Sequence, residues 1–392
     1  MRERWKGPAA VVAAIAVAEA AAMLLRPRTG LADPAPVKAE SYFSPAELDR
    51  ARRFGRPQLA LFGAILAVKG GVLGALVRRP PQLRPAASGA VLTLSLAIAP
   101  LPLAAVARRR SMAVGLITQP WRGWAADVAK SLVIQGVEGA VFGAGATALV
   151  RRLGSRWWIA GSGAAVATSA AFTYAGPVLL APLFNRFTDL PPGPAREDIL
   201  ELAGRAGLKV GRVLSVDASR RTTAANAYVT GLGPTKRVVL YDTLIRDFTR
   251  AETRLVVAHE LAHVRHRDVR NGLLYLALVA PPATFAISRL AGPDPSLPAL
   301  TAASVLVTAP IGVVANSLSR AIERRADTYA LEATGDTQAF VEFQRRITLK
   351  NLGDPDPPRW LSLLAGTHPT TVERIGLALA TAPATDRSPG GS

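Results

Sequence analysis

The stretch VVAHELAHVRHRD, residues Val256 to Asp268, holds three of the chain's four histidines behind an apolar lead-in. His259 and His263 are four residues apart, so on a helix both project from one face and can bind one metal ion. Glu260 flanks the same position, where a carboxylate can take a proton from a metal-bound water whose pKa the metal lowers toward ~7. This HExxH pattern also arises by chance on ordinary helix faces, so the assignment depends on a third ligand.

The best candidate for a third ligand is Glu323, in the segment from Asn316 to Asp327. It could complete a His2Glu zinc site, while Asp327, four residues later on the same helical face, could accept the free N–H of a ligating histidine. As bare sequence, such a pair is usually a solvated helix face. His266 lies a further turn along, beyond the reach of a shared ion on a straight helix, so we interpret it as a supporting or structural residue.

The fourth histidine, His368, lies in the predicted turn Gly366–Pro369. From such a loop an imidazole could stabilise an anionic tetrahedral intermediate, although an ordinary surface histidine fits the sequence equally well. The chain contains no cysteine, which excludes disulfides, thiolate metal sites and cysteine nucleophiles. Any metal must therefore be held by His, Asp or Glu.

The composition points to a membrane protein. The 392 residues are 49% hydrophobic and carry a formal net charge of +19. The basic residues form short clusters between apolar runs, such as Arg108 to Arg110, and no nucleic-acid motif accompanies them. We therefore expect the positive charge to face lipid headgroups and expect no nucleic-acid partner.

Apolar runs predict seven membrane spans. The first could instead be a signal peptide, but it exceeds the usual length of a signal-peptide apolar core, so we favour a retained span. Pro281-Pro282 makes the sixth span the weakest. The expected spans are Gly7–Leu25, Gln58–Val77, Ala87–Val106, Ser131–Val150, Trp157–Pro182, Leu273–Ile287 and Leu297–Leu318.

Charged and polar residues indicate the topology and a possible interior. Basic residues flank the last two spans closely, which predicts that the polar part of the chain faces the cytoplasm in a multi-pass protein of the cytoplasmic membrane. Lys69, Gln135 and Glu138 lie well inside predicted spans, where they either line a cavity or pair locally.

These patterns divide the chain into three parts. Residues 1–183 form a membrane domain with five spans, residues 184–380 a peptidase-like domain with two further spans at about 272–288 and 297–318, and residues 381–392 a disordered tail. Within the second part, a capping box at Thr249 to Glu252 starts the helix of the opening stretch. The other elements expected there are a helix at Pro194–Ala206, a strand at Arg212–Val216, and a hairpin of Asn226–Gly231 and Arg237–Tyr241 around Gly233-Pro234.

From Tyr42 to Ala378 the chain resembles the M48 family of zinc metallopeptidases, most closely the Ste24-type CAAX prenyl proteases. The resemblance rests on HELAH at His259–His263, on the segment Ser319–Asp327, and on four shorter motifs. These are Pro182–Phe187, Asn226–Tyr228, Asp242–Leu244 and Thr367–Pro369.

The resemblance implies a predominantly α, polytopic membrane protein, with a seven-helix barrel around a water-filled chamber and a zincin-type, gluzincin-like α+β catalytic domain. It implies one zinc ion per chain, held by His259, His263 and Glu323, with Glu260 as general base and His368 assisting the transition state. Asn226, Ala227 and Tyr228 would lie on an edge strand to which the substrate adds as a strand.

The expected function is therefore that of an integral-membrane zinc metalloendopeptidase acting on membrane-associated or lipidated peptides and proteins. A membrane transporter or channel, or a catalytically silent scaffold with a metal-binding site, is the alternative.

Overall fold

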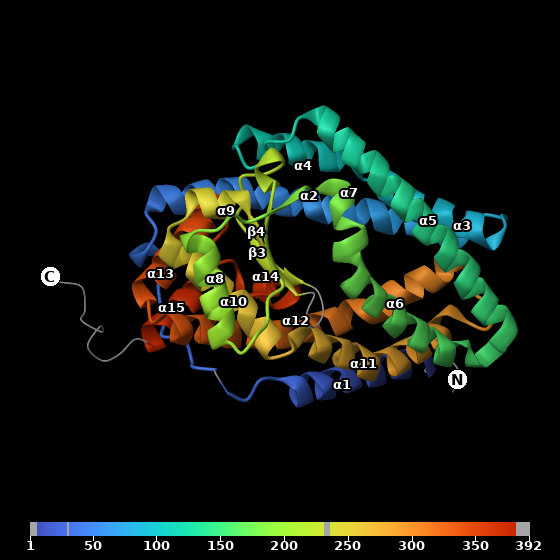
Figure 1. Cartoon of the computed structure of the whole chain (residues 1–392). Coiled ribbons are helices and arrows are strands. Elements are labelled where there is room, and N and C mark those ends of the chain that lie inside the picture. The colour runs from blue at the N-terminus through green and yellow to red at the C-terminus, as the bar shows by residue number, and fades with distance from the viewer. Residues whose placement is uncertain (1–5, 30, 231–235, 382–392) are drawn as a thin grey trace.

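The structure is a computed structural model that describes residues 6–29, 31–230 and 236–381. It is predominantly helical, with one small sheet beside the C-terminal helices and long helices extending away from it (Figure 1). Of the expected disordered tail, Thr381 ends α15 and the other residues lie outside the described ranges. The longer helices are α1 (Lys6–Leu25), α2 (Pro45–Arg78), α3 (Pro85–Ile98), α4 (Leu101–Ala113), α5 (Trp121–Leu153), α6 (Trp157–Leu179), α8 (Pro194–Arg205), α10 (Arg250–Arg265), α11 (Asp268–Ala291), α12 (Leu297–Thr334), α13 (Thr337–Lys350) and α15 (Thr371–Thr381).

Within the described residues, six helical segments are long and apolar enough to cross a membrane. One of them, Trp121–Leu179, folds back at the 3-10 turn η2 (Gly154–Arg156) into the helices α5 and α6 (Figure 1). The third expected span is interrupted at Ala99–Pro100 and becomes α3 and α4, because prolines at 100 and 102 favour a new helix start. The chain is a multi-pass membrane protein, as its composition predicted.

The tightest helix contact in the membrane part joins α3 to α5. A side chain at Gly89 would place its Cβ 2.0 Å from the carbonyl oxygen of Gly139, and one at Gly143 would lie 2.8 Å from the Cα of Gly89. Gly139 and Gly143 form a GxxxG pattern, which lets two backbones approach closely where lipid supplies no hydrophobic driving force between helices. Larger residues at these positions would separate the two helices.

Helix α1 packs against the late helices α11 and α12 rather than standing apart from them. Its contact face is a stripe of buried alanines, Ala10, Ala14, Ala18 and Ala21. The chain then runs to the peptidase-like part, where the Ala35 amide donates to the Gly376 carbonyl at 3.0 Å. Phe43 is buried in the same region, against Val372 and Ile375 of α15.

The sheet has the strand order β1-β2-β4-β3, from β1 (Phe187–Asp189), β2 (Arg212–Val216), β3 (Ala227–Thr230) and β4 (Arg237–Tyr241). β2 and β4 are parallel, and the other two pairings are antiparallel. The β3–β4 pairing confirms the expected hairpin strands, although the turn at Gly233-Pro234 lies outside the described residues. Among the described strands β3 is an edge strand.

The long helices bury few residues. In α2, 0% of the most apolar stretch is buried, against 33% in α12. Lys69 and Glu138 are exposed, and among the described residues neither they nor Gln135 has a hydrogen-bond or ion-pair partner. Of the two alternatives left open by the sequence, local pairing is therefore not found for these three side chains within the described part. Such helices suit an arrangement with lipid on one face and water on the other.

Candidate metal centre

The helix that carries the motif, α10, is fixed at both ends. Thr249 accepts from the Glu252 amide at 3.2 Å and the Glu252 carboxylate accepts from the Thr249 amide at 2.7 Å, which confirms the expected capping box. At its C-terminal end, Arg267 adopts a left-handed conformation with φ 58°, and α11 begins at the next residue, Asp268. This two-residue connection, His266 and Arg267, brings Asp268 back toward the histidines.

Three acceptor groups converge between α10 and α12. The Nε2 atoms of His259 and His263 lie 3.2 Å apart, and the two carboxylate oxygens of Glu323 lie 3.1 Å and 3.6 Å from them. One ligand atom from each of these residues lies within 4.8 Å of the others. His266 is elsewhere, with its ring edge-on to Tyr329 at 6.3 Å between centroids. The structure thus brings together the three residues predicted as ligands and leaves His266 outside them.

Each of these two histidines is backed by a carboxylate that is itself paired with an arginine. His259 Nδ1 lies 2.9 Å from Asp327 Oδ1, and Arg374 donates to both Asp327 oxygens at 2.6 and 2.8 Å. On the other side, His263 Nδ1 lies 3.0 Å from Asp268 Oδ2, and Arg325 donates to Asp268 Oδ1. A carboxylate at Nδ1 fixes the proton there, so both Nε2 lone pairs point toward Glu323.

This arrangement fits a divalent cation. When both rings carry their proton on Nδ1, two imidazole lone pairs and a carboxylate face one another, and within the described part of the chain the buried Oε2 of Glu323 makes no hydrogen bond. Burial opposes the imidazolium form of His259, yet the neighbouring Asp327 and Glu323 raise its pKa to about 10. The carboxylates thus favour a positive charge at this point, and a divalent cation can supply it in place of the proton. Imidazole and carboxylate ligands in a His2Glu set suit zinc.

Glu260 and His368 lie beside this cluster. Burial raises the pKa of Glu260 above its ordinary value, which strengthens the carboxylate as a base. His368 Nε2 lies 3.3 Å from Glu323 Oε2 while His368 Nδ1 lies 2.9 Å from Thr367 Oγ1. Burial lowers the pKa of His368, so its imidazole is neutral at neutral pH and can donate one N–H.

The edge strand β3 runs past Glu260, between two cavities. Asn226 lines one cavity together with His368, Arg374 and Phe340, and Tyr228 lines the other. Glu260 lines both. Ala227 itself is buried and pairs with Leu240 of β4, so it fixes the strand in the sheet. A peptide added along the free edge of β3 would pass from one cavity to the other across the carboxylate of Glu260.

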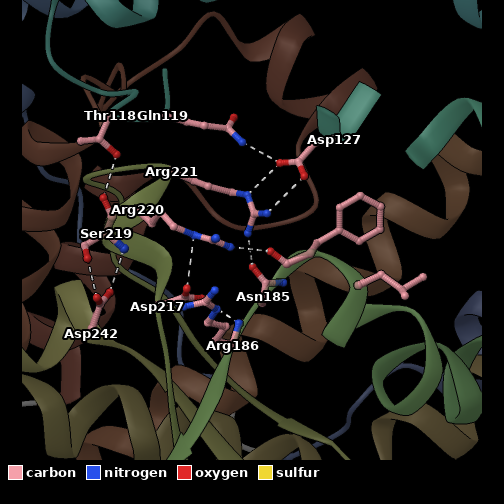
Figure 2. A network of polar contacts seen from close by, with 12 residues as sticks. Thr118, Gln119, Asp127, Asn185, Arg186, Asp217, Ser219, Arg220, Arg221 and Asp242 are labelled. Carbon is pink, nitrogen blue, oxygen red and sulfur yellow. Dashed lines mark hydrogen bonds and ion pairs between the residues drawn. The ribbon is translucent and has the colours of Figure 1, made fainter. Parts of the chain in front are cut away.

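A polar network fastens the segment before β3 to the membrane helices (Figure 2). Its centre is Arg221, which donates to Asp127 of α5 at 3.0 Å and to Asn185 Oδ1 at 2.7 Å. Gln119 also donates to Asp127, at 2.6 Å. Backbone bonds complete the junction, because the amide of Thr118 donates to the Arg221 carbonyl at 3.1 Å. The approach to β3 is therefore tied to both α5 and the end of α7 (Ala181–Phe184).

Comparisons with known proteins identify the same family that the sequence motifs indicated. Residues 194–382 match the model of peptidase family M48, and the protease HtpX homolog of Ralstonia pickettii is 31% identical over 204 residues, covering 45% of this chain and 70% of that protein. This chain belongs to peptidase family M48. Residues 112–186 match the CAAX prenyl protease N-terminal model of five membrane helices. The prediction of a membrane metallopeptidase is confirmed.

Two further proteins and one solved structure are similar to this M48 protein over different shares of its length. The uncharacterized metalloprotease YhfN of Bacillus subtilis is 29% identical over 73% of this chain and 71% of that protein. CAAX prenyl protease 1 of Saccharomyces cerevisiae is 38% identical, but over only 26% of this chain and 23% of that protein. The crystal structure of S. mikatae Ste24p shares the fold, with a TM-score of 0.74 and 19% identity over 96% of this chain and 99% of that one.

Three residues that support the metal ligands of this M48 protein were not predicted from its sequence: Asp268, Arg325 and Arg374. Asp268 could have been found, because it directly follows the histidine-rich stretch and a sharp turn there would return it to the motif. The two arginines gave no comparable signal, since Arg374 is far along the chain from Asp327 and reaches it only through the packing of α15. Buried carboxylates require a partner, but sequence alone does not name it.

Proposed function

We propose that this protein is a zinc metalloendopeptidase that cleaves membrane-associated or lipidated peptides and proteins. The zinc would be held by His259, His263 and Glu323, with one ion per chain. The observation that carries the proposal is the convergence of two Nε2 lone pairs and a buried carboxylate at one point beside Glu260. The lipidated class of substrate is supported by the CAAX prenyl protease relatives and by the membrane helices next to the site.

In the proposed mechanism the chain's own residues bind, orient and move protons. Bound zinc supplies Lewis acidity and acidifies the attacking water. Asn226, Ala227 and Tyr228 hold the substrate as an added strand, with its scissile carbonyl in front of Glu260. Glu260 takes the proton from the water and passes it to the leaving amine. His368 donates its N–H to the developing oxyanion, and Asp327 holds His259 in the orientation that binding requires.

The matched variants Glu260→Gln and His263→Ala test this proposal. Glu260→Gln keeps all three ligands and should retain one zinc per chain while losing at least ~100-fold in kcat, because general-base catalysis is typically worth that much. His263→Ala should lose the metal itself. Zinc content and cleavage of a membrane-associated peptide are measured on both. Full activity in Glu260→Gln would remove the assigned mechanism.

The proposed location is the cytoplasmic membrane, with the site facing the cytoplasm. Among the arginines that flank the last spans, Arg325 pairs with Asp268 and Arg320 donates to the Gly366 carbonyl, whereas Arg267 and Arg270 have no described partner and remain available to the membrane surface or substrate. Because the chain has no cysteine, single cysteines can report the sidedness. In intact cells, Ser155→Cys in η2 should react with an impermeant maleimide and exposed Lys209→Cys should not; the reverse pattern would overturn the topology.

A further inference from the structure

A cavity of about 460 Å³ lies between the first turns of α2, the end of α4 and the loop after α13. None of the residues that line it lines the two cavities beside Glu260, so it is separate from the metal centre. Helix α4 lies beside α2 (Figure 1). The residues that line the cavity are Ala46, Arg50, Arg53 and Phe54 of α2, Arg110 and Ala113 of α4, Val114 directly after α4, and Leu352 after α13.

Three arginines line this cavity, and two of them have no partner in the described part of the chain. Arg53 pairs with Asp49 on its own helix, and the other acid in these turns, Glu47, is paired with α13. Arg50 and Arg110 make no side-chain hydrogen bond or ion pair among the described residues, and the Nε atom of Arg110 is buried. A buried donor without an acceptor is unfavourable. An anion in the cavity would satisfy both guanidinium groups.

The two helices that form the cavity run antiparallel at this point. The Gln58 side chain of α2 donates to the Ala107 carbonyl at 3.2 Å and to Ser111 Oγ at 2.9 Å. One turn earlier on α2, Phe54 shares the cavity with Val114, which follows on the chain after Ser111. The later part of α2 and the earlier part of α4 therefore lie on the same side of the cavity, and both belong to the long apolar segments of the chain.

The cavity lies at the level of the membrane surface. On the side of the apolar segments, Phe62 of α2 and Val106 of α4 are exposed, as lipid-facing residues are. Close to the cavity, the Arg108 guanidinium lies over the rings of Trp121 and Trp124 at the start of α5, 5.3 and 5.6 Å from their centroids. Tryptophan at the end of a span is typical of the interface between membrane and water. The free arginines are thus placed where lipid headgroups lie.

We propose that this cavity binds a phosphate group through Arg50 and Arg110, and that an anionic phospholipid carries it. Guanidinium groups bind phosphate oxygens through paired, charge-assisted hydrogen bonds. The apolar part of the lining, Phe54, Val114 and Leu352, suits the glycerol and acyl portions of a lipid, which a free phosphate ion lacks. Because Leu352 belongs to the peptidase part, the bound lipid would contact both parts of the molecule.

A single cysteine can report whether the cavity is occupied, because the chain has no cysteine of its own. Ala113→Cys places an exposed thiol in the lining, and Ser41→Cys places one outside it. The rate of reaction with a soluble maleimide is measured on the full-length protein in a zwitterionic detergent. Phosphatidylglycerol, phosphatidylcholine or inorganic phosphate is then added. We expect phosphatidylglycerol to slow the reaction of Ala113→Cys several-fold and to leave Ser41→Cys unchanged, and phosphatidylcholine, whose headgroup has no net charge, to protect much less.

Matched arginine variants separate the cavity from general attraction to a basic surface. Arg50→Gln and Arg110→Gln remove charges from the lining, whereas Arg52→Gln and Arg109→Gln remove exposed charges from the same helices outside it. Each cavity variant should raise the phosphatidylglycerol concentration for half-protection by roughly 10-fold, as loss of a charge-assisted hydrogen bond predicts. The two control variants should leave that concentration nearly unchanged. The unfolding temperature without lipid is measured on all four and should not fall, because Arg50 and Arg110 hold no described partner.

Each outcome has a definite meaning. Protection by phosphatidylglycerol but not by inorganic phosphate assigns the phosphate to a lipid headgroup, whereas equal protection by inorganic phosphate assigns it to a free ion. Protection by neither would overturn the phosphate site, as would equal protection by phosphatidylcholine and phosphatidylglycerol. An equal loss of protection in Arg52→Gln and Arg109→Gln would also overturn it, because diffuse attraction would then account for binding. None of these measurements uses zinc or peptide cleavage, so failure of the proposed peptidase function would leave the lipid site standing.

Discussion

The peptidase part and the membrane part of this protein treat polar side chains in opposite ways. Around the metal centre, carboxylates are closed into pairs with arginine, as in Asp327 with Arg374 and Asp268 with Arg325. Inside the long helices, Lys69 and Glu138 have no partner among the described residues and are exposed. A ligand set must be held within a fraction of an ångström, whereas residues that line water need no fixed partner.

The peptidase part is also more tightly packed than the membrane part. The sheet and the helices around α10 form one apolar core with fully buried side chains such as Leu240, Val257 and Leu261. The membrane helices bury little and meet closely at a few places, above all where Gly89 contacts α5. Rigidity is therefore concentrated at the metal centre, and substitutions should have effects that follow this division.

The largest effect is expected for Arg374→Met. It would leave Asp327, whose side chain is fully buried, with no cationic partner, and removal of one partner of a buried pair costs about 3–5 kcal/mol. His259 would also lose its fixed orientation, so zinc affinity should fall by roughly 10- to 100-fold. Thermal unfolding and zinc titration of the purified protein measure both effects.

Arg325→Met is the matched control, because Arg325 supports His263 through Asp268. Asp268 is slightly exposed and is bound by Arg325 through a single nitrogen, whereas Arg374 binds Asp327 through two. We therefore expect Arg325→Met to lower both stability and zinc affinity, but by less than Arg374→Met does. If Arg325→Met lost as much stability and zinc affinity as Arg374→Met or more, the buried Asp327–Arg374 pair would not be the more important of the two pairs.

An intermediate effect is expected at the junction between the two parts, for Arg221→Met. Its bonds to Asp127 and Asn185 orient the chain that leads into β3, and they lie away from the metal ligands. KM should rise, with kcat/KM falling by about 10-fold, a loss of ~1.4 kcal/mol, while zinc content stays unchanged. Arg220→Met, which removes a more exposed arginine of the same network (Figure 2), should do less. Loss of zinc in Arg221→Met would contradict a role confined to the strand.

The metal ligands and the long helices could be predicted from the sequence, whereas strand β1 and the break between α3 and α4 could not. Helical periodicity placed His259, His263 and Glu323 on faces that could meet, and apolar length placed the long helices. Strand β1, with three residues, is too short for a pattern to show and depends on pairing with β2. The break between α3 and α4 was missed because apolar length alone does not register how proline interrupts a helix.

The supporting residues were harder to predict than the ligands. A ligand pattern is local, because four residues make one helical turn, whereas the choice of Arg374 for Asp327 is made by packing between α12 and α15. The same applies to Arg221, whose partner Asp127 lies in a membrane helix. Cationic residues are abundant in this chain, so charge alone could not indicate which of them are paired.

A smaller effect is expected from an ion pair at the rim of the peptidase part. Arg246 and Lys350 lower the pKa of Asp247 to about 2, although partial burial opposes this. A folded-state pKa below the ordinary 3.8 stabilises the fold above that value, and the contribution is lost as the pH falls through about 2. Because Arg246 is exposed and solvent screens its charge, Asp247→Asn should lose at most about 2 kcal/mol at pH 7, and progressively less as the pH falls through 2. Unfolding followed against pH measures this; a difference that grows on acidification would contradict it.

The smallest effect is expected at Glu138, and its neighbour gives the sharpest contrast. Glu138→Gln removes a charge that has no partner among the described residues, so stability should change by less than ~0.5 kcal/mol. Gly139→Ala, one position along, forces a Cβ to within 2.4 Å of Thr93 Oγ1 and 2.7 Å of the Gly89 carbonyl, and should cost about 1–3 kcal/mol. Thermal unfolding in one detergent compares the two. If Glu138→Gln proves as damaging as Gly139→Ala, Glu138 has a partner, and the membrane helices do not enclose open water beside it.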